Sequence, residues 1–162
     1  MVTDMKILVF SDSHGVLNEM CAAIDAEEPD YVIHLGDHIR DAEALMRFYP
    51  QLPVRYVRGN CDLTDYTALE MAVVMYGNVR IMMCHGHRYG VKNSLLRLTM
   101  AAKEQAADVV LFGHTHCPYC EEYDNLWLVN PGAAGHGCYG IVEVIGQKIS
   151  CQIKQKGSNR ED

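Results

Sequence analysis

Short apolar runs alternate with amphipathic segments through the first third of the chain. Apolar runs at residues 6–11, 31–35 and 54–57 predict buried strands, because each is bounded by polar or turn-forming residues. Between them, residues 16–27 and 41–49 place apolar side chains at helical spacing and stop before a proline, which predicts two helices. Alternating strands and helices indicate a parallel α/β sheet with right-handed crossovers.

The rest of the chain is richer in strands. Gly77-Asn78 separates two apolar segments, residues 72–76 and 79–84, and predicts a hairpin. A helix is expected at residues 94–105 and a buried strand at residues 109–112. Further strands are expected at residues 121–123, 126–130, 140–144 and 148–153.

Length and composition fit one globular domain. The chain has 162 residues, 49% hydrophobic and 22% charged, so we expect a single domain over residues 1–154 and a polar tail over residues 155–162. The net charge of −7 argues against a specific nucleic-acid surface. Seven cysteines, an odd number, together with the lack of a signal-like start or a long apolar stretch, predict a cytoplasmic protein that is not membrane-bound.

The polar residues that follow the predicted strands share one chemistry. Carboxyl ends of strands form the ligand-binding edge of an open α/β sheet, so side chains there are expected to converge. Any one such segment is typical of a turn or a helix cap, but five together indicate a site. The five are Asp12-Ser13-His14, Gly36-Asp37-His38, Gly59-Asn60-Cys61-Asp62, His85-Gly86-His87 and Gly113-His114-Thr115-His116.

The converging side chains are of the kinds that bind divalent transition metals. A tetrahedral ion takes four ligands, so seven ligands suit two ions that share one bridging carboxylate. Two ions about 3.5–4 Å apart suit in-line attack on phosphorus. The candidates are Asp12, His14, Asp37, Asn60, His85, His114 and His116.

In this order, the five segments resemble the calcineurin-like metallophosphoesterase superfamily. The short chain, Gly59-Asn60-Cys61-Asp62 and the Asn130-Pro131-Gly132 turn are similar to its small bacterial and archaeal phosphodiesterases, the branch related to the retromer subunit Vps29. The resemblance covers residues 6–153. It implies an α/β fold with four layers, an α/β/β/α sandwich of two mixed β-sheets flanked by helices.

The resemblance also implies the ligands of each ion. Manganese is the expected metal, with nickel, cobalt, iron or zinc as alternatives. Asn60, Asp37 and His85 are the expected catalytic residues, and a homodimer or homotetramer is expected by analogy. The first ion would be bound by Asp12, His14, Asp37 and His116, and the second by the bridging Asp37 together with Asn60, His85 and His114.

The implied reaction is hydrolysis of a small phosphodiester, in which a hydroxide bridging the two ions attacks phosphorus. A phosphomonoesterase is a lesser alternative. The alternative from another class is a Vps29-like metal-binding scaffold for protein interactions, without catalysis. Because the chain retains all seven ligand positions, the enzyme is favoured.

Neighbours of the ligands are expected to orient them or to contact substrate, although each also has a purely structural interpretation. Cys61 stands where many superfamily members have the His of Gly-Asn-His-Glu, and a thiol with a pKa of about 8.5 is a poor general acid. Substrates with good leaving groups, or another acid such as His87, are therefore favoured. The remaining candidates are Asp62 and His38 for orientation, and Arg58, Arg40 and Arg88 for phosphate contact.

Two other features are expected to be structural. Cys117-Pro118-Tyr119-Cys120 has the pattern of a glutaredoxin site, but a strand and a turn are expected after it instead of the helix that lowers a thiol pKa. Free thiols are expected there in preference to a zinc site completed by His136 or Cys138. His34 lies inside a predicted strand and is expected to be a hydrogen-bonded core residue.

Overall fold

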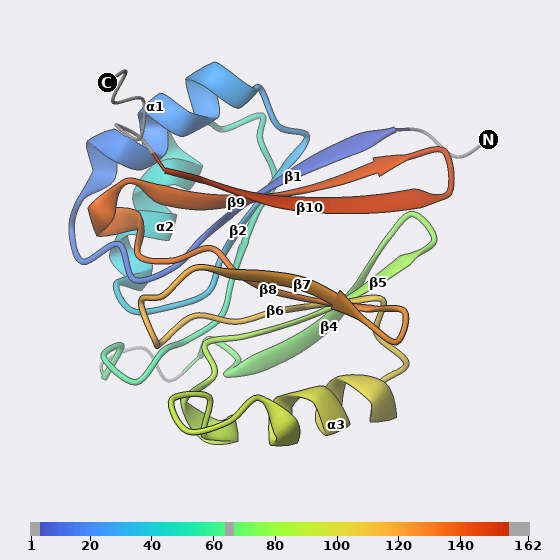
Figure 1. The fold of residues 1–162 in the computed structure, drawn as a ribbon. Helices are drawn as coiled ribbons and strands as arrows, with labels where there is room; N and C mark the ends of the chain where they lie inside the picture. The colour runs from blue at the N-terminus through green and yellow to red at the C-terminus, as the bar shows by residue number, and fades with distance from the viewer. Residues whose placement is uncertain (1–3, 64–66, 156–162) are drawn as a thin grey trace, which may run out of the picture.

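The computed structural model describes residues 4–63 and 67–155, which form two stacked five-stranded sheets (Figure 1). The first sheet has the strand order β10-β9-β1-β2-β3. Its β1, β2 and β3 are parallel, whereas β9 is antiparallel to β1 and β10 is antiparallel to β9. The strands are β1 (Met5–Phe10), β2 (Tyr31–His34), β3 (Val54–Tyr56), β9 (Cys138–Ile145) and β10 (Lys148–Gln155).

The second sheet has the order β4-β5-β6-β8-β7 and is also mixed. The hairpin predicted at Gly77-Asn78 is confirmed as the antiparallel pair β4 and β5. Parallel pairing joins β5 to β6 and β6 to β8, and β7 closes the edge in antiparallel pairing with β8. The strands are β4 (Met71–Tyr76), β5 (Val79–Cys84), β6 (Val109–Leu111), β7 (Tyr119–Tyr123) and β8 (Leu126–Asn130).

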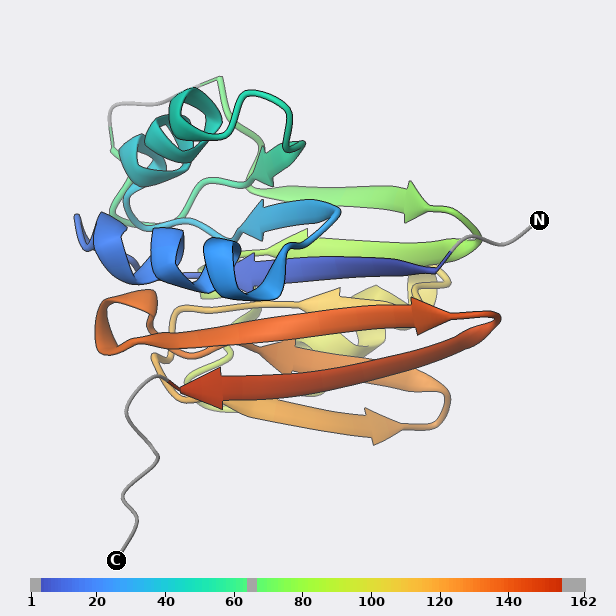
Figure 2. The ribbon, with the colours of Figure 1, turned by 90° about the horizontal axis from the view of Figure 1, so that it is seen from above.

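Helices cover the two outer faces of the stacked sheets. Helices α1 (Leu17–Glu27) and α2 (Ile39–Phe48) lie beside the first sheet, and α3 (Leu96–Glu104) lies against the second (Figures 1 and 2). There are two short 3₁₀ helices: η1 (His87–Tyr89) follows β5, and η2 (Ala134–His136) precedes β9. The expected four-layer α/β/β/α sandwich of two mixed sheets is confirmed. No helix in the described residues is long and apolar enough to span a membrane.

Strand β1 shows why a continuous apolar run predicts a buried strand here. Ile7 and Val9 lie on the face of β1 that points into the core between the two sheets. Leu8 and Phe10 point the opposite way and pack against Met20 of α1. These four side chains are essentially inaccessible to solvent, so both faces of this part of β1 are covered.

Several predicted boundaries shift by one or two residues, and two of these shifts have a clear physical basis. Helix α2 begins at Ile39, two residues earlier than expected, because a carboxylate from a distant loop accepts the Ile39 amide and caps the helix. Strand β10 continues to Gln155, so this residue is paired with Cys138 instead of belonging to the predicted tail. The remainder of that tail, residues 156–162, lies outside the described residues.

The cysteine pair of the glutaredoxin-like pattern lies in a strand and in the turn before it. Cys120 is part of β7 and Cys117 precedes it in an exposed turn, so the predicted strand is confirmed. All seven cysteines are free thiols. Burial raises the pKa of Cys120, which leaves that thiol protonated and unreactive near neutral pH.

Candidate metal centre

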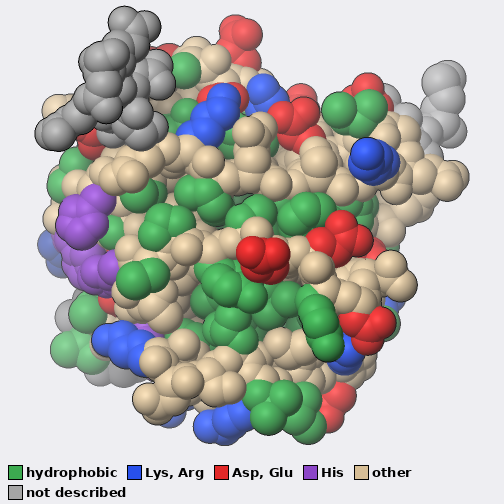
Figure 3. Space-filling model, viewed as in Figure 1, with side chains coloured by type: hydrophobic (Ala, Val, Ile, Leu, Met, Phe, Trp, Pro, Cys, Tyr) green, Lys and Arg blue, Asp and Glu red, His purple; other side chains and the backbone are tan. Residues whose placement is uncertain are grey.

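Strand ends from both sheets meet at one edge of the sandwich. β1 and β2 are parallel, as are β5 and β6, so each pair ends on one side of its sheet. Two hydrogen bonds join the pairs: the His114 amide donates to Asp12 Oδ2 at 3.1 Å, and His85 Nδ1 lies 2.9 Å from the Leu35 carbonyl oxygen. Histidine side chains gather at one edge of the face shown in Figure 3. The polar segments that follow the strands therefore converge.

Backbone strain is concentrated at these strand ends. Five of the seven predicted ligands have φ in the left-handed region, which residues other than glycine rarely adopt. Such conformations cost about 1–3 kcal/mol each and persist only where the surroundings fix them. The strained positions are therefore those at which the backbone directs a side chain toward the site. The angles are 54° at Asp12, 45° at His14, 57° at Asp37, 71° at His114 and 62° at His116.

Two of the glycines beside the ligands are required by close approach. A Cβ at Gly59 would overlap Oδ1 of Asp37, and one at Gly113 would overlap Oγ of Ser11. The loop after β3 can therefore pack against Asp37, and the loop after β6 against Ser11, only with glycine at these positions.

One cluster of potential ligands joins the ends of β1, β2 and β6. Asp12, His14, Asp37 and His116 each offer an atom, and these atoms lie within 4.8 Å of one another. Nε2 of His116 is 3.1 Å from Oδ1 of Asp12, and Nε2 of His14 is 4.0 Å from the same oxygen. These are the four residues expected around the first ion.

A second cluster shares Asp37 with the first and adds His85 and His114. Nε2 of His85 lies 3.3 Å from Oδ2 of Asp37 and 3.2 Å from Nδ1 of His114. Because a carbonyl oxygen can only accept, the contact to Leu35 places a proton on Nδ1 of His85 and leaves Nε2 open in the neutral ring. A carboxylate between two groups of imidazoles is the arrangement that a bridging ligand needs.

Asp12 provides the test of whether these residues suit a metal ion. Its Oδ2 accepts hydrogen bonds from Ser11 Oγ at 2.6 Å and from the His114 amide, whereas Oδ1 is buried with no hydrogen-bond partner among the described residues. An uncompensated buried carboxylate oxygen costs several kcal/mol. Since the ring nitrogens of His14, His85 and His116 surround this oxygen, a divalent cation fits the donor set.

Electrostatic interactions set the protonation of two members of the second cluster, Asp37 and His114. Burial acts to raise the pKa of Asp37, but its contacts with His85 and the Cys61 amide outweigh this, so the pKa is well below its usual range. For His114, burial and the neighbouring His85 lower the pKa. Near neutral pH, Asp37 is therefore ionised and His114 is neutral, the protonation states that ligands require.

Asn60 is the one predicted ligand that neither cluster contains, and its role as a ligand stays a prediction. Its side chain is exposed, and Nδ2 donates to Sγ of Cys61 at 3.6 Å. The backbone on both sides is anchored to Asp37, since Gly59 packs on that carboxylate and the Cys61 amide donates to Oδ1 at 2.9 Å. Burial and the Asp37 charge raise the pKa of the Cys61 thiol, which weakens it further as an acid.

Asp62 contacts more of the site backbone than the sequence indicates. Its two carboxylate oxygens accept four backbone amides from two loops, at 2.8 Å from Asp37, His38 and Gly59 and at 2.9 Å from Ile39. The carboxylate thus fixes the loop that presents Asp37 and caps the amino end of α2. Orientation of the ligand loop, expected of Asp62, agrees with these contacts.

The other predicted neighbours have different surroundings. His38 lies 3.5 Å from the Asp41 carboxylate and its side chain is 41% exposed. The ring of His87 lies 5.6 Å from that of His85, measured between ring centroids, so it flanks the second cluster. Arg58 donates to Glu70 at 2.7 Å. Arg40 is exposed in the first turn of α2.

Sequence reasoning missed Glu70 and the structural role of Asn130. Glu70 lies between strands in an irregular segment, where no periodic pattern marks it. Asn130 ends β8, is fully buried, and donates to the Gly113 carbonyl oxygen at 3.2 Å and to Thr115 Oγ1 at 2.9 Å. A buried asparagine at a strand end is a usable signal, because such a residue must satisfy its amide locally.

His34 is confirmed as a hydrogen-bonded core residue. The Gly36 amide donates to Nδ1 at 3.1 Å, so Nδ1 carries no proton, and Nε2 donates to Ser13 Oγ at 2.9 Å. Full burial lowers the pKa of His34 to about 4. The neutral His34 ring therefore supports the loop that contains His14.

A pH prediction follows for His34. Because its folded pKa lies below the unfolded value of about 6.5, the unfolded chain binds the proton more readily, and stability falls as pH decreases through this window. Its contribution to unfolding free energy should drop by about 1 kcal/mol between about pH 7.5 and pH 5.5. Urea unfolding with a chelator should show a shallower pH dependence for His34→Asn, which keeps the acceptor for Gly36. An unchanged pH dependence in the variant would exclude this role.

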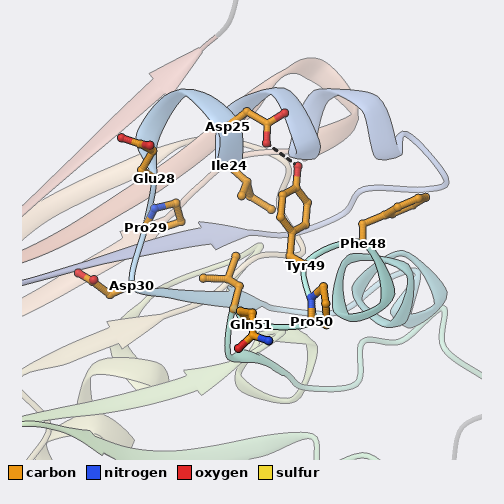
Figure 4. A pocket seen from close by; sticks show the side chains of 10 residues that line it. Ile24, Asp25, Glu28, Pro29, Asp30, Phe48, Tyr49, Pro50 and Gln51 are labelled. Carbon is orange, nitrogen blue, oxygen red and sulfur yellow. Dashed lines mark hydrogen bonds between the residues drawn. The ribbon is translucent and has the colours of Figure 1, made fainter.

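A separate groove of about 670 Å³ lies at the carboxyl ends of α1 and α2, away from the cluster at their amino ends (Figure 4). Tyr49 contributes to its lining and donates to Oδ1 of Asp25 at 2.8 Å. The lining also includes Glu28 and Asp30. Three carboxylates and two helix carboxyl ends repel anions, so this groove does not suit a phosphate ester.

The chain is similar in sequence to proteins described as phosphoesterases. Residues 5–144 match the family described as the calcineurin-like phosphoesterase superfamily domain. A probable metallophosphoesterase of Bacillus subtilis, YsnB, is 36% identical over 132 residues, which cover 80% of this chain and 75% of the relative. The phosphodiesterase YfcE of Escherichia coli K12 is 29% identical over 152 residues, 80% of this chain and 79% of the relative.

Solved structures show the same likeness. A predicted phosphoesterase from Streptococcus pneumoniae superposes with a TM-score of 0.80 at 26% identity, covering 96% of this chain and 91% of that one. Vps29 from Cryptosporidium parvum superposes with a TM-score of 0.74 at 15% identity, covering 94% of this chain and 98% of that one. At that identity, the likeness to Vps29 concerns the fold alone.

Proposed function

Since the chain belongs to the calcineurin-like phosphoesterase superfamily, we propose that it is a phosphodiesterase that requires two divalent metal ions. The observation that carries this proposal is the Asp37 carboxylate, which belongs to two ligand clusters at once. The phosphodiesterase name of the Escherichia coli relative supports the diester class. We further propose manganese as the metal, a small phosphoester as the substrate and the cytoplasm as the location, where seven free thiols remain reduced.

The proposed reaction depends on how the chain's own residues hold their atoms. Divalent ions, when bound, lower the pKa of water and offset phosphoryl charge. The Cys61 amide donates to the Asp37 carboxylate, and the Asp37 amide donates to Asp62. Both hydrogen bonds attach Asp37 to the loop after β3. The Leu35 carbonyl fixes the His85 ring with Nε2 inward.

The leaving group limits the substrates that the proposed enzyme can hydrolyse well. Cys61 replaces the usual histidine, and its raised thiol pKa makes it a weak proton donor. His87 flanks the second cluster, but burial lowers its pKa, so it is mostly neutral near pH 7. Neither group supplies a strong acid, and the proposed substrates are therefore diesters whose leaving group departs without protonation.

An activity assay distinguishes the proposed enzyme from the alternative, a metal-binding scaffold without catalysis. Metal-stripped protein should hydrolyse bis(p-nitrophenyl) phosphate only after divalent metal is restored, with manganese, nickel, cobalt, iron and zinc tested one at a time. We expect faster hydrolysis of this diester than of p-nitrophenyl phosphate, in line with the phosphodiesterase name of the Escherichia coli relative. A protein that binds metal but hydrolyses neither ester with any of the five would be a scaffold, and a preference for the monoester would reverse the diester assignment.

A further inference from the structure

Two arginine side chains lie beside the metal centre. Arg58 precedes Asn60 by two residues, and Arg88 follows His85 by three. Arg88 Nε donates to Glu70 Oε2 at 2.9 Å and Arg88 Nη2 to Oε1 at 3.2 Å, while Arg58 Nη2 reaches the same Oε1 at 2.7 Å. Glu70 therefore holds two guanidinium groups side by side.

This cluster lies next to the His85 and His114 side of the centre. Oε1 of Glu70 is 4.0 Å from Nε2 of His87. The ring of His87 is in turn 5.6 Å from the His85 ring and 6.2 Å from the His114 ring, measured between centroids. One imidazole thus separates the arginine pair from the second ligand cluster.

The arginine pair is placed to receive an anion. Arg88 has a side chain that is 69% exposed, whereas the side chains of Arg58 and Glu70 are 23% and 29% exposed. Glu70 offsets one of the two guanidinium charges, so these three side chains together carry one net positive charge.

We propose that Arg88 and Arg58 form a subsite that binds a second phosphate of the substrate, beside the phosphodiester that is hydrolysed. This inference rests on the proposed phosphodiesterase function. Guanidinium groups bind phosphate oxygens through paired hydrogen bonds, and Glu70 presents the two groups already oriented. The favoured substrates are therefore diesters that carry an additional terminal phosphate, as in a phosphorylated nucleotide ester.

The test compares two esters that differ only in that phosphate. The p-nitrophenyl ester of thymidine 5′-phosphate is measured with and without a phosphate on its 3′ hydroxyl. We expect KM to be about tenfold lower for the phosphorylated ester, the size of one charge-assisted interaction at a partly exposed site. In Arg88→Gln and in Arg58→Gln the ratio of the two KM values should fall towards one. Arg47→Gln, an exposed arginine in the last turn of α2, should keep the wild-type ratio.

Calorimetric titration separates this inference from the proposed function. Thymidine 3′,5′-bisphosphate should bind the metal-loaded protein about tenfold more tightly than thymidine 5′-phosphate, and Arg88→Gln should remove the difference. That result without hydrolysis of either ester would support the subsite and exclude the phosphodiesterase. Equal affinities in the wild-type protein would overturn the subsite even if both esters are hydrolysed. Circular dichroism of each variant confirms that it is folded.

Discussion

Asp37→Asn is expected to lower kcat/KM for bis(p-nitrophenyl) phosphate by more than about a hundredfold, beyond the loss typical of residues outside the ligand set. Asp37 is the only described residue shared by the two ligand clusters, so its charge serves both. The amide that replaces the carboxylate has one acceptor oxygen and no charge, and it cannot bridge two ions. Activity is measured at saturating manganese, and bound metal is counted by mass spectrometry in the same preparation.

A matched control distinguishes this loss from a general effect of removing a carboxylate. Asp25→Asn makes the same change at an exposed position near the carboxyl end of α1, where the carboxylate contacts Tyr49. Its activity and metal content should equal those of the wild-type protein. If Asp37→Asn keeps the activity and metal content of Asp25→Asn, the bridging role of Asp37 is excluded.

Asp62→Ala is expected to reduce both stability and activity, although Asp62 is not among the predicted ligands. The substitution removes the acceptor of four backbone amides and leaves them to water in a partly buried loop. We expect the free energy of unfolding to fall by about 3 kcal/mol, at the lower end of what four lost hydrogen bonds would give. Activity should fall about 10–100-fold, as for other residues that orient ligands. Urea unfolding and steady-state hydrolysis measure the two effects.

Asp62→Asn separates the two halves of this carboxylate. An asparagine that keeps its oxygen toward His38 and Ile39 still caps α2, but its NH₂ group faces the amides of Asp37 and Gly59. Its stability should lie between those of the wild-type protein and Asp62→Ala, while its activity should be as low as that of Asp62→Ala. Wild-type activity in Asp62→Asn would show that this carboxylate does not position Asp37.

Much of this architecture is readable from the sequence because its patterns are local. Strand β1 is a continuous apolar run because both of its faces are covered, and Asp12 and His14 directly follow it. The start of α2 at Ile39 is not local, since the group that caps it comes from Asp62. A capping residue more than twenty positions away leaves no trace in the pattern near the helix.

The arginine cluster shows the same limit within the site. Arg58 and Arg88 were recognisable as phosphate-binding candidates because each is close in sequence to a predicted ligand. Glu70 belongs to no motif, and only the fold shows that it contacts both of them. Asn60 is the opposite case, because the motif predicts a ligand while its side chain lies against Cys61.

The central claim is that this edge of the sandwich binds two ions that share Asp37. Manganese titrated into chelator-treated protein, followed by removal of free metal, should leave two ions per chain. The electron paramagnetic resonance spectrum should show exchange coupling between them, and the coupling should disappear in Asp37→Asn. A single, uncoupled manganese ion per chain at saturation would contradict the account.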